Sequence, residues 1–328
     1  MTNPPTAPPG SRDRDLIHVA AAALVDRAGR ILLAQRADDA HQGGLWEFPG
    51  GKLEPGDGID DGLARELHEE LGIVPLRHRP LIRVTHDYGD RRVLLAVHLV
   101  SEWHGDPHGR EGQPLRWVEP ARLATYPMPP ADVPIVAALT LPSSYVITPP
   151  QIGDERRLFA GLEATLGAGA RLLQLRLFDI TGSELHRIGR RFCAVCREQG
   201  ARVLLNGDVG VMRAIGADGL HLSSRQLNAA MTRPAAHGEL LAASCHTPTD
   251  LMRAAAIGAD FALLSPVLPT RSHPDADPLG WDTFAAWVDP VPLPVYALGG
   301  MSPELLDIAF AHGAQGVAGI RGLWIESA

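Results

Sequence analysis

Residues 50–73 read GGKLEPGDGIDDGLARELHEELGI, a glycine-rich turn that runs into a stretch with helical periodicity. Apolar side chains recur along this stretch at i, i+4 spacing, which places them on one helix face. They are Ile59, Leu63, Leu67 and Leu71. The pattern predicts a helix that docks on a core through this stripe.

Three carboxylates lie on the second half of this helix, at Glu66, Glu69 and Glu70. They fall within one arc about 100° wide, and Glu66 and Glu70 lie beside or inside the apolar stripe, where water is partly excluded. Like charges at this spacing repel, and more strongly where water is scarce. A divalent cation would offset the repulsion, because carboxylate oxygens suit Mg²⁺ or Mn²⁺. A solvated acidic helix face is the alternative interpretation of E-x-x-E-E alone.

The pattern G-x5-D-x7-R-E-L-x-E-E-x-G-I, which runs from Gly51 to Ile73, resembles the Nudix box of enzymes that hydrolyse nucleoside diphosphates linked to another group. Asp57 stands where that family usually has Glu. Residues 17–139 are also similar to the MutT branch, the 8-oxo-dGTP diphosphatases that sanitise the nucleotide pool. The matching segments are RADDAH at 36–41, WEFPGG at 46–51, REGQP at 110–114 and MPPADVPI at 128–135.

This resemblance implies an enzyme that uses Mg²⁺, or Mn²⁺ in its place, to convert 8-oxo-dGTP to 8-oxo-dGMP and diphosphate. The expected catalytic group is Glu66, Glu69 and Glu70, with Glu66 as the base for the attacking water. The implied metal ligands are the carbonyl of Gly50 and the carboxylates of Glu66, Glu69, Glu70 and Glu111. The implied substrate-binding residues are Arg36, His41, Asp90 and Asp132.

Asp132 departs from the family, which reads the oxidised purine with Asn at this position. An Asn amide offers a donor and an acceptor, whereas an ionised Asp offers acceptors only. Asp132 can accept the N7–H that 8-oxoguanine has and guanine lacks, but it repels O6 unless it is protonated. The residues therefore support nucleotide hydrolysis more strongly than selectivity for 8-oxoguanine.

The 328 residues are enough for two domains, and the formal net charge of −8 argues against a nucleic-acid-binding surface. A free nucleoside triphosphate is compatible with that charge. The sequence contains no signal-peptide pattern and no apolar run of about 18 residues, so we expect no membrane partner. The three cysteines include a C-A-V-C that has no second ligand pair at zinc spacing, which favours reduced structural thiols in a cytoplasmic protein.

The predicted fold class is α/β, with a disordered tail at 1–15, a Nudix α/β/α sandwich at 16–139, a linker at 140–144 and a second domain at 145–328. Turn residues separate apolar runs within the first domain. They predict one hairpin from residues 17–25 and 31–35 and another from residues 83–88 and 91–103.

Eight short apolar segments follow, near residues 145, 171, 201, 218, 240, 261, 294 and 316, and helical stretches separate most of them. This alternation predicts a (β/α)₈ TIM barrel. Polar residues gather at the carboxyl ends of the strands, where such barrels bind ligands, and paired glycines suit phosphate binding by backbone N–H groups. The predicted ligand site is Gln174, Arg176, Asn206, Asp208, Ser244, His246, Thr270, Gly299 and Gly300.

This second domain resembles the thiamine phosphate synthase/TenI family, with matches that include LNGD at 205–208, ADGLHL at 217–222 and SPVLPT at 265–270. The synthases carry an acidic run after the HL strand that helps to hold Mg²⁺. Here residues 223–226 read SSRQ, and Asp208 alone remains of those acids. Three interpretations stay open: a barrel that makes thiamine phosphate, a tautomerase that uses His246, and a non-catalytic barrel that binds a phosphate-bearing ligand.

Overall fold

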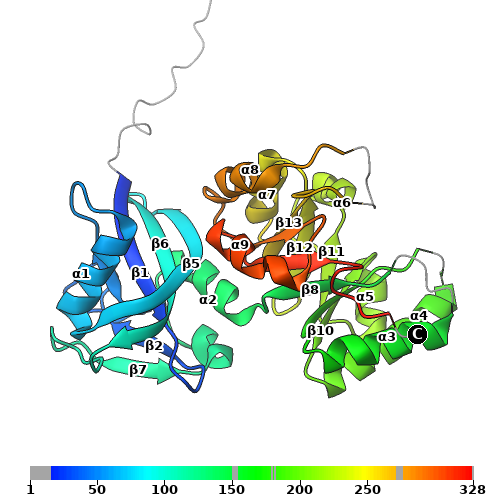
Figure 1. The fold of residues 1–328 in the computed structure, drawn as a ribbon, viewed down its shortest axis with the longest axis horizontal. Helices are drawn as coiled ribbons and strands as arrows, with labels where there is room; N and C mark the ends of the chain where they lie inside the picture. The colour runs from blue at the N-terminus through cyan, green and yellow to red at the C-terminus, as the bar shows by residue number, and fades with distance from the viewer. Residues whose placement is uncertain (1–15, 150–153, 179, 181, 271–275, 327–328) are drawn as a thin grey trace, which may run out of the picture.

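The computed structural model describes residues 16–149, 154–178, 180, 182–270 and 276–326. The tail predicted for residues 1–15 lies outside this part. Two α/β units lie side by side, and helix α2 (Val133–Thr140) leads from the first to the second (Figure 1). Among the described residues, no helix is long and apolar enough to cross a membrane.

The main sheet of the first unit has the strand order β4-β1-β6-β5, formed by β1 (Leu16–Leu24), β4 (Gly50–Lys52), β5 (Val74–Asp87) and β6 (Arg92–His104). β1 runs parallel to β6 and antiparallel to β4. β5 and β6 form the predicted hairpin around Gly89 and Asp90, although β5 begins at Val74 rather than Arg83. The longer hairpin extends the sheet toward the second unit.

The predicted hairpin between residues 17–25 and 31–35 is wrong. Residues 31–35 form β2 (Ile31–Gln35), which pairs with β3 (Trp46–Glu47) and β7 (Leu115–Val118) in a separate three-stranded sheet. An isolated bridge between Val25 and Ile31 links β1 to β2. The unit has two hydrophobic cores, one on each face of the main sheet. Leu32 packs in one of them and Leu33 in the other, so β2 contributes side chains to both.

Helix α1 (Ile59–Leu71) covers one face of the main sheet, and α2 covers the other. Leu63, Leu67 and Leu71 of α1 are fully buried against the small side chains of Ala20 and Ala22. On the opposite face, Ile135 and Ala138 of α2 pack on Ala21, Val84 and Val97, among others. The α/β/α sandwich and the docking stripe of α1 are therefore confirmed.

Eight parallel strands close the second unit into a barrel, each where the sequence predicts it. They are β8 (Ser144–Ile147), β9 (Leu172–Leu175), β10 (Arg202–Asn206), β11 (Gly219–Leu222), β12 (Leu240–Cys245), β13 (Phe261–Leu264), β14 (Val295–Leu298) and β15 (Gly316–Gly319). The surrounding helices are α3 (Glu155–Gly167), α4 (Gly182–Glu198), α5 (Val209–Ile215), α6 (Ser224–Ala229), α7 (Pro248–Ala256), α8 (Gly280–Val288) and α9 (Leu306–Ala311). Tyr145, Phe261 and Tyr296 fill the interior, with ring centroids 5.2–5.9 Å apart.

The three cysteines of the barrel are free and buried, as expected for structural thiols. Cys193 and Cys196 lie on the face of α4 that packs into the core. Burial raises the pKa of the Cys193 thiol to about 12, so the protonated form dominates.

The two units contact each other through β5 and α9, as well as through the connection from α2 to β8. The guanidinium of Arg79 lies 3.7 Å from the centre of the Phe310 ring, and Arg83 forms an ion pair with Asp289. Gln315 Nε2 donates to the carbonyl oxygens of Ala138, at 3.0 Å, and Leu141, at 3.1 Å. These contacts join the carboxyl end of α2 to the barrel.

Candidate active site in the first unit and ligand site in the barrel

Glu70 turns from the last turn of α1 toward β4, where the Gly50 N–H donates to its Oε2 at 3.1 Å. Burial raises the pKa of Glu70 to about 8, against the effect of this hydrogen bond. The negative charges of Glu47, Glu111 and Glu66 raise it further. The carboxylate is thus held in place among like charges, where a cation would favour its ionised form.

The two glycines of β4 bring the backbone against these carboxylates. Gly50 has a φ of 146°, and a Cβ there would lie 2.2 Å from the carbonyl oxygen of Ala20. A Cβ on Gly51 would lie 2.0 Å from Glu66 Oε2. At Gly50 the obstacle is backbone and φ is positive, so glycine is required there, whereas a side chain at Gly51 would displace the Glu66 carboxylate.

Arg65 ties the turn before α1 to the acidic face of the helix. Its Nη1 donates to Glu66 Oε1 at 2.7 Å and to Glu69 Oε2 at 3.3 Å. Its Nη2 donates to the Lys52 carbonyl at 2.9 Å and to Asp57 Oδ2 at 3.1 Å. Asp57 therefore reaches the arginine in spite of its shorter side chain, and the departure at this position leaves the loop anchored.

The segment around Glu111 is hydrogen-bonded to the carboxyl end of α1. The Arg110 N–H and Gln113 Nε2 donate to the Glu70 carbonyl at 3.0 and 3.2 Å. These bonds bring Glu111 close enough for its charge to raise the pKa of Glu70. Of the implied metal ligands, Gly50 bonds to Glu70 through its N–H, and Glu66 and Glu111 lie near enough for their charges to raise the pKa of Glu70. Glu69 is 57% exposed and pairs with Arg65.

Glu70 also borders a cavity of about 310 Å³ that runs to Asp132. We call it the carboxylate cavity. It is lined by Ile17, Val19, Ala21, Arg36, His41, Gln42, Glu47, Phe48, Gly50, Gly51, Lys52, Glu70, Tyr88, Arg91, Val93, Leu95, Pro129, Ala131 and Asp132. Its volume is at the lower end of the range of about 300–1,000 Å³ seen for small-molecule sites.

Asp132 lines the carboxylate cavity and is only 4% exposed. Burial and the charge of Glu47 raise the pKa of Asp132 to about 8, while Arg36 opposes the shift. The carboxyl group is therefore largely protonated at neutral pH, with one O–H donor and one carbonyl acceptor. It then offers the donor–acceptor pair that the Asn of related enzymes provides.

Arg36 and His41 both line the carboxylate cavity, as the resemblance implies. Arg36 pairs with Glu47, and its Nε donates to the His41 carbonyl at 2.8 Å. The His41 ring meets Tyr88 edge-on, with centroids 5.2 Å apart. Asp90 is outside the lining set, 54% exposed and paired with Arg91 at 2.8 Å.

Glu47, Tyr88 and Arg91 are among the lining residues that were not predicted as site residues. Glu47 lies inside the WEFPGG motif, so its place in that motif could have indicated a site residue. Tyr88 and Arg91 flank the β5–β6 turn, and their approach to the cavity depends on how the hairpin curves. Nothing in the local sequence indicates that curvature.

A chain of buried hydrogen bonds crosses the barrel interior. Gln174 Nε2 donates to the Tyr145 hydroxyl at 3.3 Å, and that hydroxyl lies 3.3 Å from His221 Nδ1. His221 Nε2 lies 2.8 Å from Ser244 Oγ. Burial lowers the pKa of His221 to about 3, so the ring is neutral. Gln174 and Ser244 of the predicted ligand site belong to this chain, which also includes His221 from outside the predicted set.

Other predicted ligand residues gather at the carboxyl ends of the strands. His246 Nδ1 lies 2.9 Å from the Ser265 carbonyl oxygen, and Arg176 lies over the Phe178 ring at 4.3 Å. Gly299 and Gly300 have φ of 100° and 69°, and the Leu268 N–H donates to the Gly299 carbonyl at 3.2 Å. Thr270 is half-buried on the same loop as Leu268, and Asn206 is half-buried at the end of β10.

Asp208 and residues 223–226, the positions that correspond to the synthase acids, do not form a magnesium site in the described part of the barrel. Asp208 is exposed and caps α5, accepting from the N–H groups of Gly210 at 2.7 Å and Val211 at 3.2 Å. Ser223 caps α6 in a capping box with Gln226, so residues 223–226 form a helix start instead of an acidic run. These residues do not fit the Mg²⁺ that the synthase resemblance implies, and we derive no step through that ion.

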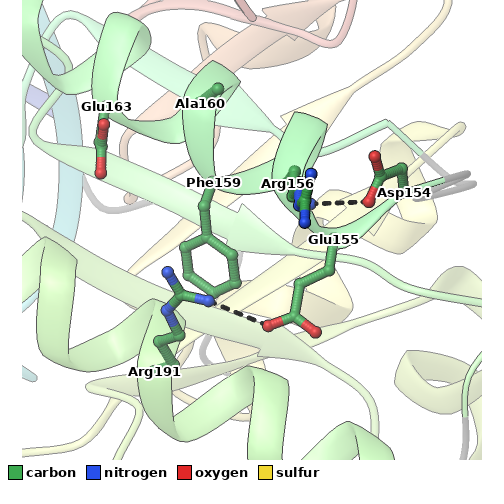
Figure 2. Close-up of a pocket in the computed structure, with 7 residues that line it drawn as sticks. All are labelled: Asp154, Glu155, Arg156, Phe159, Ala160, Glu163 and Arg191. Atoms are coloured by element: carbon green, nitrogen blue, oxygen red, sulfur yellow. Dashed lines mark hydrogen bonds and ion pairs between the residues drawn. The ribbon is translucent and has the colours of Figure 1, made fainter.

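A further hollow of about 500 Å³ lies outside both sites, between α3 and α4 (Figure 2). Arg191 stacks on Phe159 at 3.9 Å and pairs with Glu155 at 3.0 Å across it. Arg187 pairs with the same carboxylate at 2.7 Å. These ion pairs join α3 to α4, which is typical of a surface contact between neighbouring barrel helices.

Comparison with known proteins identifies both units. The thiamine monophosphate synthase model matches residues 144–323, and the NUDIX domain model matches residues 20–138. The protein thus combines a Nudix hydrolase domain with a thiamine phosphate synthase-like barrel. The chain belongs to the thiamine monophosphate synthase family through the model that matches its second half, and to the Nudix family through the relatives of its first half.

Individual relatives divide in the same way. The first half is 36% identical over 123 residues to the 8-oxo-dGTP diphosphatase of Escherichia coli, covering 38% of this chain and 95% of that protein. It is 40% identical over 117 residues to the CTP pyrophosphohydrolase of the same organism, covering 36% and 87%. The second half is 31% identical over 182 residues to the thiamine-phosphate synthase of Thioalkalivibrio sulfidiphilus, covering 55% and 86%.

Proposed function

We propose that the Nudix domain hydrolyses nucleoside triphosphates to the monophosphate and diphosphate, with 8-oxo-dGTP as its preferred substrate. One observation carries this proposal: a single cavity, the carboxylate cavity, is lined by both Glu70 and Asp132. A nucleotide in it has its phosphates beside the acidic face of α1 and its base beside Asp132. The name of the 8-oxo-dGTP diphosphatase relative supports the same substrate.

The donor set beside Glu70 fits a divalent cation, and we propose Mg²⁺, with Mn²⁺ as a substitute. The residues that would hold it are Gly50, through its carbonyl, and Glu66, Glu70 and Glu111; Glu69 would join them only by turning away from Arg65. All of these donors are oxygen atoms, which hard cations prefer. The raised pKa of Glu70 reflects the local excess of negative charge that such an ion would offset. When bound, the ion neutralises phosphate charge and lowers the pKa of water.

The protein's own side chains then have separate tasks. Glu66 takes the proton from the attacking water, and Arg65 holds Glu66 in position through the bond at 2.7 Å. Protonated Asp132 donates to O6 of the purine and accepts from the N7–H of 8-oxoguanine. Guanine lacks that N7–H, so the acceptor oxygen of Asp132 faces a lone pair and binding weakens.

Diphosphate release from a panel of nucleoside triphosphates tests this proposal. We expect the highest kcat/KM with 8-oxo-dGTP and a lower value with dGTP. The CTP pyrophosphohydrolase relative makes CTP the most useful competitor. A preference for CTP would contradict the proposed purine substrate but not the proposed hydrolysis reaction. Release of orthophosphate in place of diphosphate would contradict the reaction itself.

For the barrel we propose a site for a phosphate-bearing ligand in place of thiamine phosphate synthesis. The capped helix start at Ser223 and the capping role of Asp208 favour this alternative, because diphosphate ionisation needs electrostatic stabilisation. The Gly299–Gly300 turn and Arg176 are the proposed phosphate contacts. Incubation with the two thiamine precursors and Mg²⁺ is expected to yield no thiamine phosphate, and formation of that product would contradict the proposal.

A further inference from the structure

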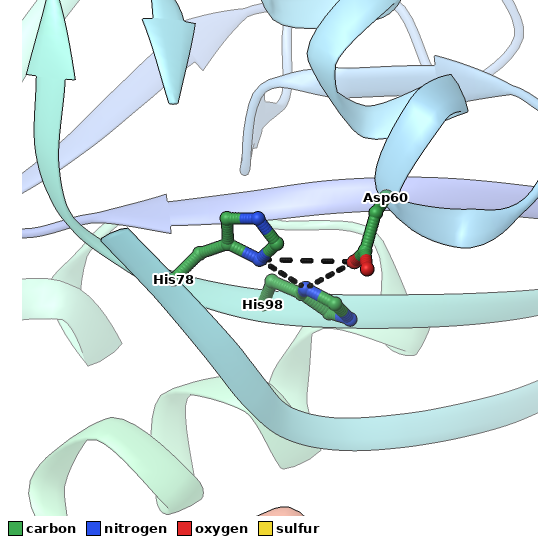
Figure 3. A group of neighbouring side chains, drawn as sticks. All are labelled: Asp60, His78 and His98. Carbon is green, nitrogen blue, oxygen red and sulfur yellow. Dashed lines mark hydrogen bonds and ion pairs between the residues drawn. The ribbon is translucent and has the colours of Figure 1, made fainter. Parts of the chain in front are cut away.

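A second cluster of metal-binding side chains lies in the Nudix domain, away from the carboxylate cavity (Figure 3). It joins Asp60 in the first turn of α1 to His78 of β5 and His98 of β6. Side chains two residues apart on a strand share a face, and Val100 packs in the core beneath α1. His98 therefore faces α1, whereas Val93 and Leu95 of the same strand line the carboxylate cavity on the other face.

The three ligand atoms surround a common point. His78 Nδ1 lies 3.0 Å from His98 Nδ1, and Asp60 Oδ1 lies 3.8 Å from the first and 3.6 Å from the second. A point equidistant from all three atoms is about 2.0 Å from each, which is the bond length of zinc to histidine nitrogen and carboxylate oxygen. Figure 3 shows the two rings turned toward each other and toward the carboxylate.

A hydrogen bond accounts for the contact between the two histidines but not for the position of Asp60. The two Nδ1 atoms face each other, so one ring must carry its proton there if both are neutral. The carboxylate oxygen lies beyond hydrogen-bond distance from both rings, at 3.6 and 3.8 Å. His98 is 7% exposed, and burial lowers its pKa, which favours the neutral form that binds metals. The three ligand atoms lie within 4.8 Å of one another, which is close enough for them to share one ion.

We propose that Asp60, His78 and His98 bind a divalent d-block cation, with zinc as the ion whose ligand preferences they fit. The point equidistant from the three atoms lies in their plane, so the exposed Asp60 carboxylate has to shift toward the two nitrogens to give a tetrahedral site with water as the fourth ligand. Asp60 is 71% exposed, so the ion can enter from solvent. Bound there, it ties the first turn of α1 to the β5–β6 hairpin and so fixes the helix that carries the catalytic carboxylates.

This site and the acidic face of α1 select different ions. Asp60 and Glu70 are ten positions apart on α1, which is about 15 Å along the helix axis. Two imidazoles suit zinc, nickel or copper, whereas the all-oxygen set near Glu70 suits Mg²⁺. The positive charge of Arg83 lowers the pKa of His98 and opposes a cation, so the Asp60 carboxylate is needed for affinity.

Zinc titration of the full chain in saturating Mg²⁺ tests the proposal by calorimetry. We expect one zinc ion per chain and at least about a tenfold loss of affinity in Asp60→Asn and in His78→Gln, because each removes a ligand. Asp61→Asn is the matched control, since this neighbouring exposed acid lies outside the cluster. Its affinity should equal that of the unmodified protein. Cobalt in place of zinc should give a tetrahedral visible spectrum that both ligand variants lose.

Three results would overturn the site. Zinc binding that Asp60→Asn and His78→Gln leave unchanged would show that the ion lies elsewhere. Loss of the zinc ion in Glu70→Gln, with both ligand variants unaffected, would place it at the catalytic carboxylates. If the protein bound no zinc at micromolar concentrations, His78 and His98 would be a hydrogen-bonded pair and not part of a metal site. Asp60 is exposed, so its variant should fold even if substitutions of buried His98 do not.

Discussion

Glu70 of the Nudix domain and Asp208 of the barrel are two acids that the family resemblances single out, and their surroundings differ. Glu70 is partly buried among other carboxylates, with a pKa raised to about 8. Asp208 is exposed and accepts two backbone N–H groups of α5. Ionised Glu70 is destabilised by burial and by the neighbouring negative charges, and a bound cation would offset this. Asp208 already has hydrogen-bond donors from the protein backbone. A resemblance to a family motif therefore does not by itself predict the surroundings of an acid in the folded protein.

The largest expected effect comes from removing the charge of Glu70. Glu70→Gln keeps the shape and the acceptor for the Gly50 N–H but removes a proposed metal ligand. We expect nucleotide turnover to fall by about 10²–10³-fold or more, because electrostatic stabilisation of this kind is worth several kcal/mol. Diphosphate release at saturating Mg²⁺ measures the loss.

Glu163→Gln on the outer face of α3 is the control and should keep full turnover. Its side chain is exposed and lies outside the carboxylate cavity. If Glu70→Gln kept turnover within a few-fold of the unmodified protein, Glu70 would be no more important for activity than an exposed acid. The proposed catalytic role of the α1 carboxylates would then be wrong.

The pH dependence of stability gives the next largest effect. A carboxyl group whose pKa rises from 4.5 to about 8 on folding binds more protons in the folded state between those values. Its contribution to the free energy of unfolding is therefore favourable below pH 4.5 and declines as pH rises through 8. For Glu70 in metal-free protein, we expect a loss on the order of 2–4 kcal/mol across that range.

Denaturation in EDTA at pH 5 and pH 8.5 measures this decline. Glu70→Gln should reduce it and should be the more stable form at the higher pH. Saturating Mg²⁺ should restore most of the lost stability in the unmodified protein but not in the variant. Equal pH slopes for the two proteins would show that Glu70 does not carry the electrostatic cost.

Asp132 provides a smaller effect, on selectivity. Burial raises its pKa to about 8, so the protonated form that mimics Asn prevails at pH 7 and is lost above pH 8. We expect the preference for 8-oxo-dGTP over dGTP to fall by about tenfold between pH 7 and 9, since one buried hydrogen bond is worth about 1–1.5 kcal/mol. The ratio of the two kcat/KM values removes pH effects on the chemical step.

Asp132→Asn supplies the control for that measurement. The amide does not titrate, so the preference should stay constant from pH 7 to 9. It should match that of the unmodified protein at pH 7. A selectivity that declines equally in both proteins would contradict the role of Asp132 protonation.

The sequence predicts most of this architecture because its signals are local. Helical spacing gives α1, and short apolar runs give all eight barrel strands. Strand partners are not local, so β2 was paired with β1 although it joins β3 and β7. The beginning of β5 was missed because Pro75, Arg77 and Pro80 interrupt its apolar pattern.

The same limit applies to the sites. The α1 acids and Asp132 follow from motifs, but the raised pKa of Asp132 depends on burial and on Glu47, which is distant in the sequence. His78 and His98 belong to different strands and meet only through the register of the β5–β6 hairpin. Their spacing along the chain matches no short ligand motif.

The smallest expected effect separates the two possible roles of Asp208. As the N-cap of α5, it should contribute about 1 kcal/mol, so Asp208→Ala should lower the free energy of unfolding of the barrel by that amount. Asp208→Asn should restore it, because Asn caps as well as Asp. If the carboxylate instead held a divalent ion, Asn would not replace it, and Mg²⁺ would stabilise the unmodified barrel but neither variant. Denaturation of the three proteins with and without Mg²⁺ decides between a helix cap and a remaining metal ligand.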